Sequence, residues 1–231
     1  MYMVNHIGII LDGNRRLAKR LMLQPWKGHE FGAQKVMKLV DWCSELDVNE
    51  LTLYAFSMQN FNRPKQEFDY LMKLFVEFCN DEEMIRRLHR NQIRVNFIGR
   101  IHLFPEEVYV SMKRLIEETK DYSNHTINFA VAYGGREEII DAVKKLGRDI
   151  ESGKVDVSSI NEETFENFLY MKSEPELIIR TGGDHRTSNF LAWQSTYSEW
   201  FFLQKFWPEF EKEDLVSVID QFEKRERRFG K

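Results

Sequence analysis

The sequence predicts an α/β fold in which a central, mostly parallel six-stranded sheet is flanked by helices. Two observations support this prediction. Short apolar, strand-like runs recur at about 4–11, 50–56, 93–99, 126–132, 176–180 and 197–203. Helix-like stretches lie between most of them, at about 30–46, 65–89, 105–121, 136–151 and 161–169, with a last one at 210–227. Alternation of strands and helices is typical of a parallel sheet with helices on its faces.

Individual segments carry further signals. The run 4–11 (VNHIGIIL) is apolar throughout, as in a buried strand. The stretch 65–89 is amphipathic, because one helical face collects Phe68, Leu71, Met72, Phe75, Phe78 and Cys79. The stretch 146–159 is the loosest part and indicates a helix end that runs into a surface loop. The run 177–180 (LIIR) is a short strand that ends in an arginine.

Length and composition limit the function. We expect one domain over residues 1–231, which can bury roughly 70–75% of its unfolded surface. A formal charge of −4 argues against general nucleic-acid binding. Cys43 and Cys79 lack metal-type spacing and are expected to be buried thiols in a reducing compartment. No signal peptide or long apolar run is visible, so we expect a cytoplasmic protein that does not span a membrane.

The run 177–202 (LIIRTGGDHRTSNFLAWQSTYSEWFF) carries the strongest functional signal. Arg180 and Arg186 flank Gly182 and Gly183, and a glycine turn of this kind leaves backbone N–H groups free to face a ligand. Ser188 and Asn189 favour a helix start immediately afterwards. Together these features predict a site for a phosphate-like anion. The alternative is a polar β-to-α turn with two solvated arginines.

A second anion-directed strand end lies near the N-terminus. The strand 4–11 is followed by Asp12-Gly13-Asn14-Arg15-Arg16, which opens a helix. Parallel sheets bind ligands beyond the carboxyl ends of their strands. The carboxylate could be a salt-bridged cap, or it could hold a divalent cation against a phosphorylated ligand. The second strand end of the same kind favours the metal–phosphate interpretation, although a basic helix face in solvent is an alternative for the arginines.

Six motifs, which fall in the same order and spacing as in a known family, give a resemblance over essentially the whole chain. They are HIGIILDGNRR at 6–16, YAFSMQNFNRP at 54–64, AYGGREEI at 132–139, RTGGDHRTSNFLAWQ at 180–194, SEWFF at 198–202 and RERRFG at 225–230. On these motifs the chain resembles the cis-prenyltransferases, the undecaprenyl diphosphate synthase family. Several long motifs in register are a specific signal.

The resemblance implies a reaction and a set of residue roles. An allylic prenyl diphosphate would condense with isopentenyl diphosphate, with Mg²⁺ as cofactor, to give a cis-prenyl diphosphate. Catalytic roles are implied for Asp12, Ser57 and Asn60, substrate binding for Gly13, Asn14, Arg15, Arg16, His29, Arg63, Arg180, Arg186, Ser188, Arg228 and Gly230, and metal binding for Asp12, Glu199 and His185. Gly13, Asn14 and Arg16 would hold the allylic diphosphate, with help from His29 and Arg63. Arg180, Arg186 and Ser188 would hold isopentenyl diphosphate.

The resemblance also implies partners. It implies a homodimer in which Glu199 completes the metal site across the interface and the ending Arg228-Phe229-Gly230 reaches the partner subunit. Contact with a membrane surface is expected to be peripheral and transient. Simpler alternatives stay open: His29 as a capping residue, Glu199 facing solvent, and the charged tail as an ordinary helix end. A non-catalytic relative that binds polyprenyl carriers or supports a partner is the alternative function.

Four positions depart from the family pattern at or near the allylic side: Leu17, Pro25, Gln59 and Phe61. They make the expected pocket less cationic and alter its aromatic wall. Phe75 and Phe78 add bulk to the helix that would form the wall of the product tunnel. We therefore predict products much shorter than undecaprenyl, or unusual use of donor or acceptor.

Overall fold

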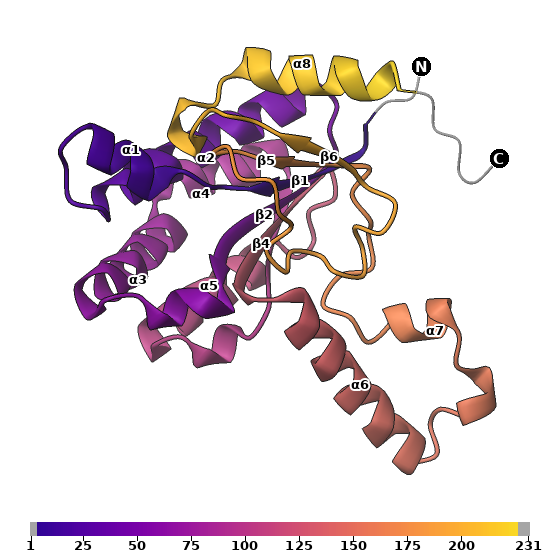
Figure 1. The fold of residues 1–231 in the computed structure, drawn as a ribbon. Coiled ribbons are helices and arrows are strands. Elements are labelled where there is room, and N and C mark those ends of the chain that lie inside the picture. Colours follow the sequence, from indigo (N-terminus) through magenta and orange to yellow (C-terminus); the bar gives the residue numbers. More distant parts are fainter. Residues whose placement is uncertain (1–3, 226–231) are drawn as a thin grey trace.

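The six predicted strands form one sheet in the computed structural model, which describes residues 4–225 (Figure 1). The strands are β1 (His6–Ile10), β2 (Glu50–Ser57), β3 (Ile93–Ile98), β4 (His125–Tyr133), β5 (Leu177–Arg180) and β6 (Glu199–Phe202). Their order is β3-β4-β2-β1-β5-β6, and every neighbouring pair is parallel. The predicted fold class is therefore confirmed, with a sheet that is parallel throughout.

Strand register decides which residues share an edge of the sheet. Ile10 at the end of β1 is opposite Tyr54 of β2 and Arg180 of β5. Since parallel strands end at the same edge, the loops after β1, β2 and β5 converge there. Glu199 begins β6 opposite Leu177, the first residue of β5, and so lies at the other edge.

Eight α-helices lie in the part of the chain that the structure describes. They are α1 (Asn14–Arg20), α2 (Lys27–Glu45), α3 (Lys65–Asn80), α4 (Glu82–Asn91), α5 (Glu106–Thr119), α6 (Gly135–Glu151), α7 (Glu162–Glu166) and α8 (Lys212–Glu223). Short 3₁₀ turns add η1 (Met58–Asn62), η2 (Ile101–Leu103), η3 (Val157–Ser159) and η4 (Trp207–Glu209). No helix of the described residues is long and apolar enough to cross a membrane.

The prediction of one helix over 65–89 is wrong. The backbone of Asp81 is extended, with φ −68° and ψ 111°, and ends α3. Its Oδ1 accepts a hydrogen bond from the Met84 N–H at 2.7 Å, so Asp81 is the N-cap of the separate helix α4. The apolar period continues across the break and hid it from the sequence pattern.

The helix expected after Ser188 and Asn189 is also absent. Both residues are in the left-handed region, with φ of 51° and 63°, which does not start a right-handed helix. Asn189 instead serves the start of α6: its carbonyl accepts from the Gly135 N–H at 2.7 Å, and its Oδ1 accepts from the Arg136 N–H at 2.9 Å. The capping chemistry was predicted correctly, but for the wrong helix.

The two faces of the sheet are covered differently. One face packs against helices, and its core includes Leu39 of α2, Met112 of α5 and Leu215 of α8. The other face packs against the irregular segments on either side of β5, through Met171 before it and Phe190 and Leu191 after it. Helix α6 runs away from the sheet in Figure 1 and, in this single chain, leaves an apolar strip half exposed.

Both cysteine thiols are buried, as the sequence predicts. Burial raises the pKa of Cys43 and of Cys79 to about 12, so neither is a thiolate at neutral pH.

Candidate active site

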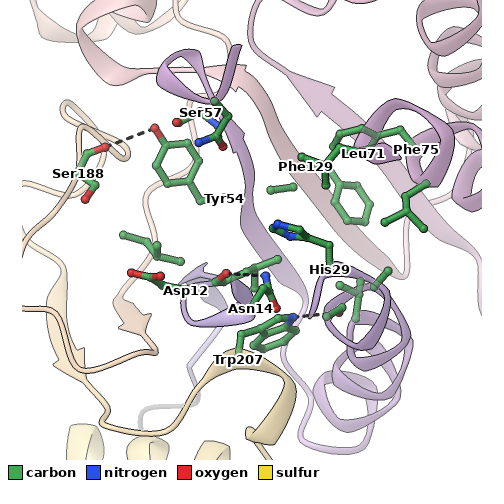
Figure 2. Close-up of a pocket in the computed structure, with 18 of the residues that line it drawn as sticks. Asp12, Asn14, His29, Tyr54, Ser57, Leu71, Phe75, Phe129, Ser188 and Trp207 are labelled. Atoms are coloured by element: carbon green, nitrogen blue, oxygen red, sulfur yellow. Dashed lines mark hydrogen bonds between the residues drawn. The ribbon is translucent and has the colours of Figure 1, made fainter. Parts of the chain in front are cut away.

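A cavity of about 620 Å³ opens at the carboxyl edge of the sheet. Its polar lining comprises Asp12, Asn14, His29, Ser57, Gln59, Asn60, Arg63, Arg180, Ser188 and Asn189. Its apolar lining includes Val36, Leu71, Leu74, Phe75, Phe78, Phe97 and Phe129. In Figure 2, Asp12, Asn14, Tyr54 and Ser188 gather on one side of the view, and Leu71, Phe75 and Phe129 on the other. One cavity thus joins a polar end to an apolar end.

Asp12 is an ionised carboxylate at the polar end. It receives Arg180 Nη2 on Oδ2 at 2.8 Å and Arg16 Nη2 on Oδ1 at 3.0 Å. Burial opposes its ionisation, but the Arg180 hydrogen bond and the charges of both arginines outweigh burial and hold the pKa of Asp12 below its ordinary value. Thr181 fixes the backbone, since its Oγ1 donates to the Asp12 carbonyl at 2.8 Å.

Arg180 is almost fully buried, at 3% exposure, and is held from two sides. Its Nη1 donates to the Arg186 carbonyl and to Ser188 Oγ, both at 2.6 Å, while Nη2 binds Asp12. Its Nε has no hydrogen-bond partner within the described residues. Tyr54 O–H donates to the Ser188 carbonyl at 3.4 Å, which ties the loop after β5 to β2 (Figure 2).

The glycine turn differs from the prediction in one respect. Gly182 and Gly183 have φ of 92° and 82°, as such a turn requires. Their N–H groups do not face a ligand: they donate to the carbonyls of Lys205 and Leu203, at 2.7 and 2.8 Å. The chain that follows β6 takes up these donors, so the anion site depends on side chains.

Asp184 lies close to three arginines around the glycine turn. Its Oδ2 lies 3.2 Å from Arg16 Nη2, 2.9 Å from Arg186 Nη2 and 3.9 Å from Arg180 Nη2. The Arg186 side chain is 61% exposed and can therefore rotate toward a ligand. Neither Arg16 nor Arg186 lines the cavity, but both reach its lip through Asp12 and Asp184. No role was predicted for Asp184 from the sequence.

A second charge cluster forms the lip on the α2–α3 side. His29 Nε2 lies 3.2 Å from Arg63 Nη1 and 3.5 Å from Glu67 Oε1. Arg63 Nη1 contacts the same Glu67 oxygen at 3.1 Å, and Arg15 Nε approaches it at 3.6 Å. Burial, with the charge of Arg63, lowers the pKa of His29 although Glu67 opposes this, so His29 is neutral at pH 7.

Glu67 is the functional candidate that the sequence motifs missed. Its side chain is 3% exposed, and its contact with His29 and the charges of Arg63 and Arg15 hold its pKa below the ordinary value. The signal was available, since Arg63 and Glu67 stand four residues apart at a helix start. Arg15 points outward, at 54% side-chain exposure, and does not line the cavity.

The turns after β1 and β2 shape the polar end of the cavity through their backbone geometry. Gly13, with φ of 107°, lets the chain turn from β1 into α1, and a Cβ there would lie 2.7 Å from Phe206 Cδ1. Ser57 and Asn60 line the cavity after β2, where the Ser57 N–H donates to Asn60 Oδ1 at 2.9 Å. Asn14 also lines the cavity, and its buried Oδ1 has no partner within the described part.

The predicted metal set is not assembled within one chain. Glu199 begins β6 at the opposite edge of the sheet from Asp12 and pairs with Arg225. His185 is exposed and stacks on Phe202, with ring centroids 4.9 Å apart. No group of three or more His, Cys, Asp or Glu side chains in residues 4–225 could hold a metal ion. Arg228 and Gly230 lie outside the described residues.

Three of the four departures from the family pattern lie away from the cavity. Leu17 is buried in α1, and Pro25 lies in the loop before α2. Phe61 packs into an aromatic cluster, with its ring centroid 5.1 Å from that of Phe56 and 5.6 Å from that of Phe104. Only Gln59 lines the cavity, so the expected change of aromatic wall through Phe61 is wrong.

Phenylalanines line the apolar end of the cavity. Phe78 of α3 meets Phe129 of β4 edge to face, with centroids 5.2 Å apart, and Phe129 stacks on Phe97 of β3 at 5.4 Å. All three line the cavity, together with Phe75. The predicted bulk at Phe75 and Phe78 is therefore placed on the cavity wall.

Comparison with known proteins gives the family. The family model described as "Putative undecaprenyl diphosphate synthase" matches residues 10–230. This chain belongs to the undecaprenyl diphosphate synthase family of cis-prenyltransferases. A relative from Methanopyrus kandleri is 47% identical over 98% of this chain and 84% of its own, and one from Pyrococcus horikoshii is 46% identical over 98% and 86%. Both are named tritrans,polycis-undecaprenyl-diphosphate synthase (geranylgeranyl-diphosphate specific).

Solved structures agree with this assignment. The cis-prenyltransferase chain superposes on lavandulyl diphosphate synthase from Lavandula x intermedia, in complex with dimethylallyl diphosphate, with a TM-score of 0.95, 33% identity and 99% coverage of each chain. A probable undecaprenyl diphosphate synthase from Campylobacter jejuni gives a TM-score of 0.82, 31% identity and full coverage of both chains. The chain is therefore a prenyltransferase of the kind that elongates cis-prenyl chains, and the non-catalytic alternative is not supported.

Proposed function

We propose that this cis-prenyltransferase condenses an allylic prenyl diphosphate with isopentenyl diphosphate in a Mg²⁺-dependent reaction, and that its products are shorter than undecaprenyl. The observation that carries the proposal is the cavity that joins Asp12 and Arg180 to an apolar wall of bulky phenylalanines. The polar end suits diphosphate and the apolar end suits a prenyl chain of limited length.

The reaction requires residues that stabilise the developing charges. The allylic C1–O bond breaks and the diphosphate leaves with the electron pair; the isopentenyl double bond then forms the new bond to C1, and a proton is lost to set the cis double bond. Arg180, Arg186 and Ser188 would hold isopentenyl diphosphate, with Arg180 kept in place by its buried contacts. Asn14, His29 and Arg63 would bind the allylic diphosphate, with Gly13, Arg15 and Arg16 beside them.

The residues at the polar end fit Mg²⁺. This ion is usually bound through one or two carboxylates together with substrate phosphates, and it keeps several waters. Asp12 offers an ionised carboxylate, and the diphosphate would supply further oxygens. When bound, Mg²⁺ would neutralise charge on the leaving diphosphate. Ser57 and Asn60 would lie close to the reacting carbons.

A homodimer would complete the site. Ile140 and Val143 of α6 are 51% and 50% exposed in the single chain, which suits a contact with a second copy. Since Glu199 lies at the far edge of its own sheet, its proposed metal role requires the partner subunit. Light scattering of Ile140→Glu tests this: we expect a monomer with reduced activity, and an unchanged dimer would refute the assignment of α6.

A second candidate comes from the relatives' names. It is an enzyme that starts from geranylgeranyl diphosphate and makes a long product of undecaprenyl type. One experiment separates the two: purified protein is incubated to exhaustion with isopentenyl diphosphate, Mg²⁺ and allylic diphosphates from dimethylallyl to geranylgeranyl. Mass spectrometry then gives the product lengths. A single product of undecaprenyl length would refute the short-product proposal, and no Mg²⁺-dependent product from any donor would refute the proposed reaction.

Dimethylallyl diphosphate incubated alone tests unusual coupling. The Lavandula structure contains this compound, which is why it belongs among the donors. Products formed without isopentenyl diphosphate would support unusual acceptor use, and their absence would restrict the enzyme to regular extension.

A further inference from the structure

We propose that the turn between α1 and α2 docks onto an anionic lipid membrane. The turn consists of residues 21–26, and we call it the α1–α2 turn. It projects from the side of the molecule away from α6 and α7 in the view of Figure 1. The inference deepens the proposed function and rests on it for its purpose, since a prenyl diphosphate is an amphiphile that exchanges with a lipid phase.

Three consecutive apolar side chains are exposed at this turn. Leu21, Met22 and Leu23 are 49%, 95% and 42% exposed, and Met22 is nearly as exposed as a free side chain. The turn is nevertheless ordered by backbone hydrogen bonds: Met22 N–H donates to the Lys19 carbonyl at 3.1 Å, and Leu23 N–H to the Ala18 carbonyl at 2.8 Å. An ordered turn that holds apolar side chains in water indicates an apolar partner.

The backbone at Met22 strengthens this inference. Its φ is +55°, in the left-handed region that follows many helices, where glycine or asparagine is usual. A methionine there is strained, and it gains no packing within this chain because its side chain is exposed. The sequence therefore keeps a flexible apolar side chain at a position where a smaller residue would be more stable.

The charge around the turn selects an anionic surface. Between Gly13 and Gly28 the chain carries five cations, which are Arg15, Arg16, Lys19, Arg20 and Lys27, and no carboxylate, whereas the whole chain has a net charge of −4. Four of these cations have carboxylate partners: Arg15 pairs with Glu67, Arg16 with Asp12 and Asp184, Arg20 with Glu209 and Lys27 with Glu30. The exposed Lys19 has no ion pair within the described residues. Apolar side chains flanked by cations are typical of segments that bind anionic membranes.

The turn also adjoins the mouth of the cavity. Trp26 ends the turn, and its ring lies 6.4 Å from that of Tyr70 on α3, the helix that forms the cavity wall. His29, two residues after the start of α2, lines the cavity. A docked turn would therefore hold the cavity entrance close to the headgroups, where Trp rings are favoured.

Vesicle flotation tests the proposal with the full chain. Vesicles of phosphatidylcholine with phosphatidylglycerol are compared with vesicles of phosphatidylcholine alone, with no substrate present. We expect preferential binding to the anionic vesicles, weakened by salt. Met22→Asn should weaken this binding about tenfold, from the lost burial of the side chain. Lys19→Gln should weaken it about fivefold, from the lost cation.

The controls separate docking from folding and from catalysis. Met22→Asn suits the left-handed backbone and should unfold no more easily than wild type. Val157→Asn changes an equally apolar side chain, 65% exposed, on a different loop and should leave vesicle binding unchanged. Both variants should turn over soluble short-chain substrates at the wild-type rate without vesicles.

Three outcomes would overturn the proposal. They are no binding of the wild type to anionic vesicles, equal binding by Met22→Asn, or a change of oligomeric state in Met22→Asn by light scattering, which would make the turn an interface between copies. Vesicle binding by a protein that forms no prenyl product would instead refute the proposed function and leave the membrane contact standing.

Discussion

Asp12 follows strand β1, and Arg180 is the last residue of the neighbouring parallel strand β5. The two residues form an ion pair in which Arg180 Nη2 lies 2.8 Å from Asp12 Oδ2. Arg180 is 3% exposed, so Asp12 compensates a nearly buried cation. The same contact keeps Asp12 ionised. Arg180 therefore keeps Asp12 charged, and Asp12 holds Arg180 in position. This ion pair connects the two proposed diphosphate sites.

Asp12→Asn should abolish most turnover while keeping the fold. Loss of one preorganised charge-stabilising group typically lowers the rate about 10²–10³-fold. Asparagine preserves the shape and one hydrogen-bond acceptor for Arg180, whereas alanine would remove that acceptor altogether. Steady-state rates and circular dichroism check this, with Asp69→Asn, an exposed carboxylate on α3, as the matched control. A folded Asp12→Asn enzyme of near wild-type rate would remove Asp12 from the mechanism.

Arg186→Ala should raise the KM for isopentenyl diphosphate about tenfold and change the KM for the allylic substrate far less. One charge-assisted hydrogen bond is worth about 1.5–3 kcal/mol, and Arg186 is exposed enough to be removed without disturbing the core. Kinetics with one substrate varied at a time measure both constants. Arg86→Ala, which removes an exposed arginine of α4, should change neither. Equal increases for the two substrates would mean that the pockets are misassigned.

Phe78→Ala should lengthen the products. Removing the ring enlarges the apolar part of the cavity between α3 and Phe129, so a longer prenyl chain should fit. Phe61→Ala also deletes a ring from the aromatic region, but Phe61 does not line the cavity, so product length should stay the same. Mass spectrometry of products after exhaustive incubation makes the comparison. The same product lengths from Phe78→Ala and wild type would show that this wall does not limit the chain.

His29→Gln should reduce the loss of stability in mild acid. The pKa of His29 is lowered in the folded state, so below about pH 6.5 the unfolded chain binds a proton that the folded chain does not. Wild-type stability therefore falls as the pH drops from 6.5 toward the lowered pKa, and the variant lacks this contribution. Burial lowers the pKa of His6 as well, so part of the dependence remains. Urea unfolding at pH 7.5 and 5.0 measures the loss of stability of wild type and of His29→Gln. An equal loss in the two proteins would contradict the prediction.

Two glycine variants should have opposite effects on unfolding. A Cβ at Gly28 would lie 1.9 Å from the Asn14 carbonyl oxygen, so Gly28→Ala forces α1 and α2 apart and should destabilise by about 1–3 kcal/mol or more. Gly147 lies within α6, where an added Cβ would meet no atom within 4 Å, and Gly147→Ala should stabilise by about 0.4–1 kcal/mol. Urea unfolding of both variants measures the difference, and the same sign for both would refute the packing argument.

Much of the fold and of the polar end could be predicted because both depend on local patterns. Apolar runs located all six strands, and parallel pairing brought Asp12 and Arg180 to one edge. The start of α4 was missed because Asp81 interrupts the backbone without interrupting the apolar period. Ser188 and Asn189 were assigned to the wrong helix because capping propensity does not identify the helix that is capped.

Other features of the site depend on the three-dimensional fold and could not be predicted from local sequence patterns. The N–H groups of Gly182 and Gly183 donate to the carbonyls of Lys205 and Leu203, 23 and 20 positions later in the chain, which no local pattern indicates. Phe61 stands beside Asn60 in the sequence, but the two side chains point to different places, and the partly buried Phe61 ring packs against the core beside Phe56. Glu67 gathers His29, Arg63 and Arg15 from three segments, so only its pairing with Arg63 was visible in sequence.

The bonding of the glycine turn has a mechanical consequence. Leu203 and Lys205 hold the turn after β5, and Trp207 N–H donates to the Asp12 carbonyl at 2.9 Å, so the chain leaving β6 is bonded to both halves of the polar end. Within residues 4–225, β6 is also an edge strand of the sheet, paired on one side with β5. These backbone hydrogen bonds link β6 to Asp12. A movement of this edge strand would therefore shift the proposed catalytic carboxylate and alter its chemistry.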